Sequence, residues 1–176
     1  MTHDIERLTP DSFAAAIDEL GAVLHAAVHA GASVGFLLPC PPDETTTFWR
    51  NQLAAVRAGE KAVLVVRQGG RIVGTATLIM AGPPNGRWRA EIAKVLTHPD
   101  ARRQGIAAAL MAHAEALARA DGRRVLVLDT WTGSPVERLY AALGWTLAGV
   151  IPSYAADIHG ALHPTSYMFK ELAPHA

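Results

Sequence analysis

The sequence predicts a mixed α/β fold in which a largely antiparallel sheet contains one parallel pair of strands. Two observations support this fold class. Short β-rich runs alternate along the chain with longer segments whose apolar residues recur at helical spacing. In addition, a strand-like run at 88–98, a helical run at 106–122 and an apolar run at 125–128 follow one another directly. A strand, a crossover helix and a second strand in this order favour parallel pairing of the two strands.

The N-terminal half is expected to supply one short strand, two amphipathic helices and a β-hairpin. Prolines open both helical runs, which is typical of a first helical turn, and glycines follow them. Gln68-Gly69-Gly70 predicts a tight turn between two β-rich runs. The expected segments are a strand at 3–8, helices at 10–31 and 42–59, and strands at 62–67 and 71–80.

The C-terminal half is expected to contain the parallel unit, one more helix and two last strands. Ser134 fits the N-cap of that helix, Pro135 fits its first position, and Gly144 fits its end. The last strands are expected at 145–150 and 165–172, with a loop or hairpin at 154–163 between them. The whole chain therefore predicts a sheet of about six or seven strands with about four flanking helices.

Composition limits the class of protein. The 176 residues fit one domain spanning 1–176. Basic and acidic residues balance at 16 each, so no net charge favours nucleic acid or an anionic membrane as a partner. The N-terminus lacks the segments of a signal peptide, and no apolar run reaches the roughly 20 residues of a membrane helix. We therefore expect a cytoplasmic protein. Cys40 is the single cysteine, and its apolar and proline neighbours favour packing over nucleophilic chemistry.

The segment Arg102-Arg103-Gln104-Gly105-Ile106-Ala107, here called the phosphate loop, lies between the strand-like run at 88–98 and the next helix. A glycine-containing loop that enters a helix can bring several backbone N–H groups to one phosphate, and the helix dipole adds partial positive charge. A side chain at Gly105 would obstruct a ligand that approaches the backbone. The chain has neither the Gly-Lys-Ser/Thr of P-loop enzymes nor the Gly-x-Gly-x-x-Gly of dinucleotide-binding domains.

Two segments resemble the GNAT acyltransferase superfamily. They are 95–110, which contains the phosphate loop, and 134–145. Within the superfamily, 128–130, 133–135 and 31–36 are most similar to the tabtoxin resistance acetyltransferase subgroup. Ala107 and Ser134 stand where many members have Gly and Asn, and both changes are conservative. The resemblance implies the GNAT fold and an acetyl-CoA-dependent N-acetyltransferase.

The resemblance also implies a cofactor site between two central strands that splay apart. Unpaired backbone groups of Val95 and Thr97 would bind the pantetheine arm, and an N–H at or next to Val95 would polarise the thioester carbonyl. The phosphate loop would hold the phosphates. The cofactor-binding residues so implied are Val95, Leu96, Thr97, Arg102, Arg103, Gln104, Gly105, Ile106, Ala107 and Ser134. The proposed chemistry requires no metal.

Three side chains are expected to carry catalysis. Acylation needs a base, because free alkylammonium groups have pKa values of about 10. Strand periodicity places Glu91 on the same face as Val95, and Asp129 ends the neighbouring strand. The resemblance implies that these two acids act as the base, directly or through water. It places Tyr140 next to the coenzyme A sulfur as a proton donor. Structural roles remain as alternatives: Asp129 capping a turn, Glu91 pairing with Arg89 or Lys94, and Tyr140 packing on the sheet.

The expected acceptor is a primary amine of a small molecule, amino-acid-like or an antibiotic or toxin. The apolar loop at 31–39 is a candidate acceptor wall, with Ser33 and Phe36 as substrate contacts, and Trp131 is favoured over Trp49 and Trp88 for the same role. Acetylation of a protein N-terminus or lysine, and a non-catalytic acyl-CoA-binding module, are the alternatives. The oligomeric state stays open, with a homodimer among the options. The histidine pairs 25/29 and 159/163 have zinc-like spacing but lack a third ligand in sequence.

Overall fold

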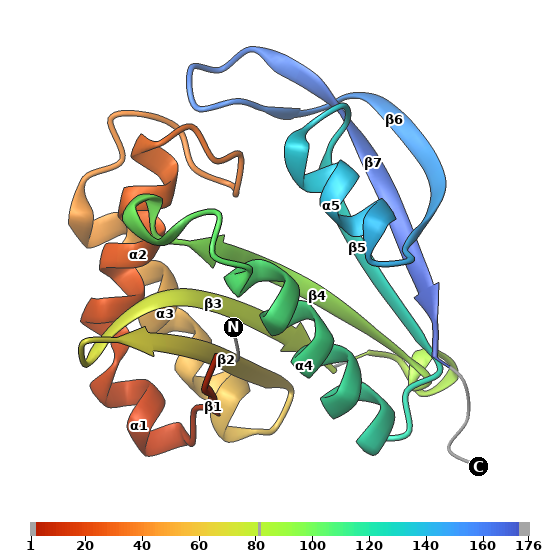
Figure 1. Ribbon diagram of the computed structural model, residues 1–176, viewed down its shortest axis with the longest axis horizontal. Coiled ribbons are helices and arrows are strands. Elements are labelled where there is room, and N and C mark those ends of the chain that lie inside the picture. Colours follow the sequence, from red (N-terminus) through yellow and green to blue (C-terminus); the bar gives the residue numbers. More distant parts are fainter. Residues whose placement is uncertain (1–2, 81, 173–176) are drawn as a thin grey trace.

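The computed structural model describes residues 3–80 and 82–172 and contains a seven-stranded mixed sheet in the order β1-β2-β3-β4-β5-β7-β6 (Figure 1). All neighbouring strands are antiparallel except β4 and β5, which are parallel. The predicted fold class is therefore confirmed. The strands are β1 (Ile5–Arg7), β2 (Lys61–Gln68), β3 (Arg71–Ile79), β4 (Arg89–Thr97), β5 (Val125–Trp131), β6 (Thr146–Ala156) and β7 (Leu162–Glu171).

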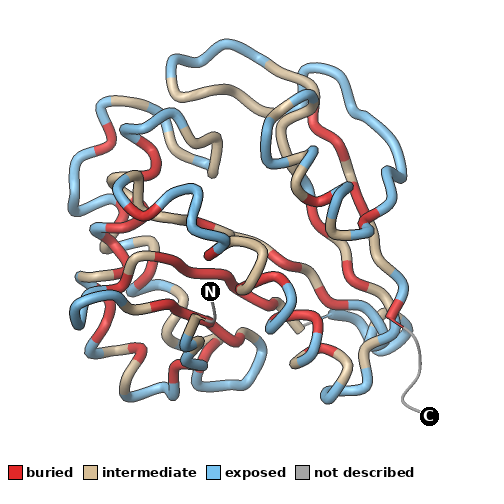
Figure 2. The backbone as a smooth tube through the Cα atoms, viewed as in Figure 1, coloured by how far each residue is buried: buried red, intermediate tan, exposed pale blue. Residues whose placement is uncertain are grey.

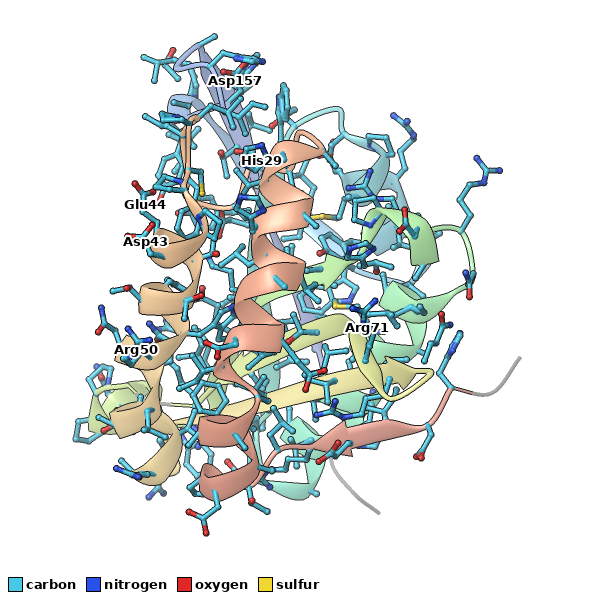
Figure 3. The ribbon with its side chains drawn as sticks, turned by 90° about the vertical axis from the view of Figure 1, so that its left-hand side faces the viewer. His29, Asp43, Glu44, Arg50, Arg71 and Asp157 are labelled. Carbon is cyan, nitrogen blue, oxygen red and sulfur yellow. The ribbon has the colours of Figure 1, made fainter. Side chains whose placement is uncertain are left out.

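Three helices, α1 (Pro10–Ala15), α2 (Ile17–His29) and α3 (Pro42–Arg57), cover one face of β2, β3 and β4. A capping box between Thr9 and Ser12 begins α1. The sequence predicted a single helix over 10–31, whereas the structure divides it at Ala16, whose backbone leaves the helical geometry. Figure 3 shows α2 and α3 side by side, with Asp43 and Glu44 at the first turn of α3.

The opposite face of the sheet carries α4 (Ile106–Ala120) and α5 (Pro135–Ala142). Helix α4 crosses over between the parallel strands β4 and β5, as the sequence predicted. Gly74 on β3 permits its close approach, because a Cβ atom at this position would lie 2.5 Å from Cγ2 of Ile106. The start of α4, and with it the phosphate loop, is thereby held directly against the sheet.

The sheet separates two apolar cores. One lies between the sheet and α4 and α5, and the other between the sheet and α1 to α3. Buried positions follow β2, β3 and β4, whereas β6 is exposed along nearly its whole length at the edge of the sheet (Figure 2). Strands β6 and β7 extend further than the sequence predicted, and of the loop or hairpin expected at 154–163 the structure shows the hairpin, which these two strands form. Within the described ranges, no helix is long and apolar enough to span a membrane.

Candidate active site

The phosphate loop forms the turn into α4, directly after the 3₁₀ helix Pro99–Ala101. Gly105 is the N-cap of α4 and has φ of 79°, a left-handed conformation that glycine adopts without steric cost. No side chain among the described residues caps this helix, so the N–H groups of its first turn are available to an anion. Arg102 and Arg103 are exposed and form no ion pair with any residue in the described ranges. The loop therefore combines free N–H donors with two free guanidinium groups.

Gln104 fixes this loop to the rest of the molecule. Its side-chain oxygen accepts a hydrogen bond from Nε2 of Gln68 at 2.9 Å, and its carbonyl lies 2.8 Å from Nε2 of His3. Ile106 is 1% exposed and packs into the core below α4. The side chains of Gln104 and Ile106 are thus engaged within the protein, and these residues present backbone groups to a ligand.

A β-bulge in β4 changes which side chains face each layer. Thr75 pairs with Leu96 and Thr77 pairs with Ala93, so β4 has one extra residue here, and Lys94 has φ of 50°. Before the bulge, Glu91 faces α3, whereas Val95 after it packs against the core under α4. The prediction that Glu91 and Val95 share a face was wrong, because the extra residue reverses the strand's alternation.

Strands β4 and β5 diverge immediately after a short paired region (Figure 1). They pair only from Arg89 with Val125 to Glu91 with Val127. The later residues of β4 therefore have no partner on the β5 side. Thr97 pairs with Gly74 of β3, and the next residue, His98, donates its N–H to the carbonyl of Val73 at 2.8 Å. Because backbone direction alternates along an antiparallel strand, the N–H and C=O of Thr97 point toward the divergence.

Tyr140 lies on α5, on the face of the sheet that also carries α4, and is 5% exposed. Burial, reinforced by the negative charge of Asp129, raises the pKa of the Tyr140 phenol well above its usual value. The ring packs against Trp145, with 6.2 Å between ring centroids. Tyr140 is therefore held as a neutral phenol beside β5.

Two further contacts fix α5. Ser134 is its N-cap and accepts a hydrogen bond from the N–H of Glu137 at 3.1 Å. The Glu137 carboxylate in turn accepts hydrogen bonds from the Gly133 N–H and the Ser166 hydroxyl of β7. Ser134 was predicted to bind the cofactor; in the structure its hydroxyl is engaged in capping α5.

The acidic pair lies on the opposite face of the sheet from Tyr140. Asp129 is cross-strand neighbour to Tyr167 of β7, and Glu91 is neighbour to Val127, two residues before Asp129. Residues two apart share a face, so both carboxylates project toward the α3 side. The Tyr167 hydroxyl donates to the Tyr154 hydroxyl at 2.5 Å, and this bond, with burial and the nearby charges of Asp129 and Glu91, raises the Tyr167 pKa to about 12.

A cavity of about 280 Å³ lies between α3 and strands β2 to β4. Glu91 and Lys94 line it from β4, and Lys61 lines it from β2, where its ammonium donates to Oε1 of Gln52 at 2.6 Å. The Nε1 atom of Trp49 and Oγ1 of Thr77 are buried and have no hydrogen-bond partner in the part of the chain that the structure describes. The complete lining is Phe48, Trp49, Gln52, Lys61, Val63, Thr77, Ile79, Glu91, Ala93 and Lys94.

The loop at 31–41 is bound to the tip of the β6–β7 hairpin. The Ser33 hydroxyl donates to the carbonyl of Ala156 at 3.4 Å, and the N–H of Leu38 donates to the carbonyl of Ile158 at 2.9 Å. Phe36 packs edge-on against Phe48, which lines the cavity, with 5.8 Å between ring centroids. These contacts connect the two segments on the α3 side of the sheet.

The amino-acid sequence matches the model of the Acetyltransferase (GNAT) family over residues 26–145. This match covers more than half of the chain and includes β4, the phosphate loop, Asp129 and Tyr140. The chain belongs to the GNAT acetyltransferase family. It is an acetyl-CoA-dependent N-acetyltransferase of that family.

Solved structures of GNAT proteins share the fold at low sequence identity. An N-acetyltransferase from Staphylococcus aureus Mu50 is 18% identical with a TM-score of 0.79, covering 98% of this chain and 100% of its own. A phosphinothricin acetyltransferase from Sinorhizobium meliloti, in complex with AcCoA, is 20% identical with a TM-score of 0.80, covering 98% and 90%. A ribosomal-protein-alanine N-acetyltransferase from Brucella melitensis is 21% identical with a TM-score of 0.76, covering 96% and 99%. At these identities the likeness shows the fold alone.

The structure places the three candidate tryptophans in different surroundings, and substrate contact by Trp131 stays a prediction. Trp131, expected to contact substrate, packs on the ring of His163 at 4.3 Å, and His163 bonds Asp157 at 3.0 Å. Trp49 lines the cavity. Trp88 is 44% exposed and is not among the residues that line the cavity. The Arg87 guanidinium lies over its ring.

The histidine pairs and the cysteine take structural places in this GNAT protein. His25 and His29 pack together at 4.2 Å between ring centroids, and Nε2 of His29 lies 3.3 Å from the carbonyl of Cys40. Cys40 is 1% exposed, and burial raises the pKa of its thiol. Within residues 3–80 and 82–172, no three His, Cys, Asp or Glu side chains are grouped so that they could hold a metal ion.

Several polar residues of the site were missed from the sequence. They are Gln52, Lys61, Lys94, Tyr154 and Tyr167. The bulge was the decisive missing information. Regular alternation along β4 would point the Lys94 side chain to the other face of the sheet, whereas the bulge directs it into the cavity. An alternating run gives no sign of such a bulge unless glycine marks it, and here a lysine occupies the left-handed position.

Proposed function

We propose that this GNAT enzyme acetylates the primary amine of a small molecule, amino-acid-like or an antibiotic or toxin. The acceptor nitrogen attacks the thioester carbonyl of acetyl-CoA directly in a ternary complex. The tetrahedral intermediate then collapses, the C–S bond breaks, and coenzyme A leaves as a thiolate. The observation that carries the proposal is the cavity on the α3 side, which Glu91 lines, while the phosphate loop and Tyr140 lie with α4 and α5 on the other side.

The donor binds across the divergence of β4 and β5. The free N–H groups at the start of α4, with Arg102 and Arg103, hold the phosphates of acetyl-CoA. The pantetheine arm lies along the unpaired edge of β4 at Val95, Leu96 and Thr97. A backbone N–H at or next to Val95 donates to the thioester oxygen, and this bond strengthens as negative charge develops in the intermediate.

The acceptor binds on the other side of the same divergence. Its ammonium loses a proton to Glu91 or Asp129, directly or through a water, because only the free amine is nucleophilic. Tyr140 supplies a proton or a hydrogen bond to the departing thiolate, and the second proton that the attacking nitrogen loses as the amide forms goes to the thiolate or restores Tyr140. Burial and the nearby Asp129 charge raise the Tyr140 pKa, so the phenol carries its proton when the thiolate forms.

An open groove for a polypeptide is disfavoured by the contacts between 31–41 and the hairpin tip. These hydrogen bonds, together with Phe36 packed on Phe48, restrict the approach to the cavity from that end. We therefore rank a small amine above a protein N-terminus or lysine. In its narrower form, the proposal places the enzyme in the tabtoxin resistance acetyltransferase subgroup. The acceptor is then a toxin or an antibiotic, and its acetylation confers resistance.

A thiol-release assay with acetyl-CoA tests the proposal directly. The panel would contain free amino acids, simple amines, amine-bearing antibiotics and peptides with free N-termini. Release with small amines, with the acetylated amine identified by mass spectrometry, supports the proposal. Acetylation of peptides alone would replace it by the protein acetyltransferase alternative. Tight acetyl-CoA binding without release to any acceptor would favour the non-catalytic module.

A further inference from the structure

Lys94 occupies a conformation that a lysine rarely adopts. It is the extra residue of the β4 bulge, and its φ of 50° lies in the left-handed region. A glycine would hold the same bulge without the steric cost that a Cβ atom brings there. The backbone alone therefore gives no reason for a long cationic side chain at this position.

The ammonium of Lys94 is held inside the cavity. Its Nζ lies 5.0 Å from the centroid of the Phe48 ring and 4.0 Å from the place where a Cβ of Gly35 would stand. Only the far end of the side chain reaches this point, so the charge sits between β4, the start of α3 and the 31–41 loop. Burial there lowers the Lys94 pKa, although the charges of Asp129 and Glu91 oppose the shift.

This ammonium lacks an anionic partner. Across the described ranges, Lys94 makes no side-chain hydrogen bond and no ion pair within 4.0 Å. The neighbouring Lys61 differs, since Gln52 accepts its hydrogen bond. Lys94 is half-buried, and a cation removed from water without a partner costs free energy that an anionic ligand would offset.

The lining of the cavity carries charges of both signs, as a site for a zwitterion requires. Glu91 contributes a carboxylate, while Lys94 and Lys61 contribute two ammonium groups. Gln52 adds an uncharged polar side chain to the lining. A volume of about 280 Å³ lies just below the roughly 300–1,000 Å³ usual for ligand pockets and fits a metabolite of amino-acid size.

We propose that the acceptor carries a carboxylate close to its amine and that Lys94 binds this carboxylate while Glu91 or Asp129 receives the ammonium. The inference rests on the proposed function and specifies its acceptor as a free amino acid or a close analogue. Lys94 is then a specificity-determining residue, because amines without the acid leave its charge unpaired. An internal role, in which Lys94 only offsets the charges of Glu91 and Asp129, is the competing explanation.

Equilibrium binding tests this inference without turnover. The wild type, Lys94→Met, Lys94→Arg and Arg50→Met proteins would be saturated with coenzyme A and titrated calorimetrically with the standard L-amino acids and their carboxamides. Methionine keeps the apolar stem of lysine and removes its charge. Arg50 lies exposed on the outer side of α3 (Figure 3), so Arg50→Met removes a nearby cation that does not line the cavity.

At least one amino acid should bind the wild type and Arg50→Met equally, and at least tenfold more tightly than its carboxamide. Lys94→Met should lose this tenfold preference, and Lys94→Arg should keep most of it. Absence of amino-acid binding to the wild type, equal affinity for acid and carboxamide, or an unchanged preference in Lys94→Met would each overturn the inference.

The thiol-release assay separates this outcome from that of the proposed function. Amino-acid binding through Lys94 without thiol release would confirm Lys94 as a carboxylate-binding residue but overturn the amino acid as the acceptor, together with the acetyltransfer to small amines. Acetylation of small amines with no preference for those that carry a carboxylate would support the proposed function and overturn the inference. Acetylation of amino acids with at least a tenfold preference in kcat/KM over their carboxamides would support both.

Discussion

The two faces of the sheet at the divergence of β4 and β5 are built in different ways. On the α4 face, the proposed donor site consists of backbone groups: the helix start at Gly105 and the unpaired edge of β4. On the α3 face, the proposed acceptor site consists of side chains from separate elements, among them Glu91, Lys94 and Asp129. Local sequence suffices for the first, whereas the second depends on how distant elements meet.

This difference explains why the donor side of the enzyme can serve many reactions, whereas the acceptor side recognises a particular substrate. A loop that offers N–H groups to phosphate needs a small residue and a helix start, and it serves any reaction with the same donor. An acceptor site recognises its ligand through charge placement, which a single side chain can change. Substitutions on the two faces should therefore have different signatures, and those signatures can be measured.

The largest effect is expected on the donor face. Gly105→Val places a β-branched side chain at φ of 79°, which strains the loop and covers the N–H groups. We expect acetyl-CoA affinity to fall by roughly 100-fold or more, which corresponds to about 2.7 kcal/mol. Calorimetric titration with acetyl-CoA measures the change.

Gly122→Val is the matched control for this prediction. Gly122 has φ of 75° at the other end of α4, so the substitution carries similar backbone strain away from the phosphate loop. Coenzyme binding should survive in Gly122→Val, with circular dichroism used to verify folding of both variants. Equal affinity in Gly105→Val and the wild type would remove the phosphate loop from the donor site.

The second effect concerns the base on the acceptor face. One of the two variants Glu91→Gln and Asp129→Asn removes the base, and in that variant kcat should fall by roughly 100-fold. A base must be deprotonated to act, so the rate of the wild type falls as pH decreases, and the variant that lacks the base should lose this acidic limb. The pH dependence of kcat/KM measures it, with the exposed Glu60→Gln as the control. If both variants retain the wild-type profile, neither acid is the base.

A smaller effect is expected from Tyr140. Tyr140→Phe should lower kcat by roughly tenfold or more while acetyl-CoA affinity stays unchanged, because the hydroxyl acts on the leaving thiolate. Its raised pKa means that the phenol keeps its proton as pH rises through the ordinary tyrosine range near 10, so no alkaline loss of rate in that range should come from Tyr140. Steady-state kinetics and ultraviolet titration of tyrosinate measure both. Full turnover in the phenylalanine variant would exclude Tyr140 from the reaction.

The sequence predicted the helices, the hairpin and the crossover unit because each depends on local periodicity and on glycine and proline signals. It also placed Asp129 and Glu91 at the centre of the sheet. It missed the Ala16 break and the left-handed Lys94, since neither residue is a glycine or proline that would mark an irregularity. The cavity was beyond reach for another reason: Gln52 and Lys94 are far apart in sequence and meet only through the packing of α3 on β4.

The smallest effect is expected on stability. Lys94→Met, which should weaken amino-acid binding, should stabilise the folded protein. Burial lowers the Lys94 pKa below its unfolded value, so the charged lysine opposes folding wherever the unfolded chain holds the proton more strongly. Lys94→Met should therefore be more stable than the wild type at pH 7. The gain should shrink as pH rises from the lowered pKa toward the unfolded value of about 10.4. Urea unfolding at several pH values measures it. A variant less stable than the wild type at pH 7 would mean that Glu91 and Asp129 already satisfy the ammonium, which would assign Lys94 to internal charge balance rather than to the acceptor.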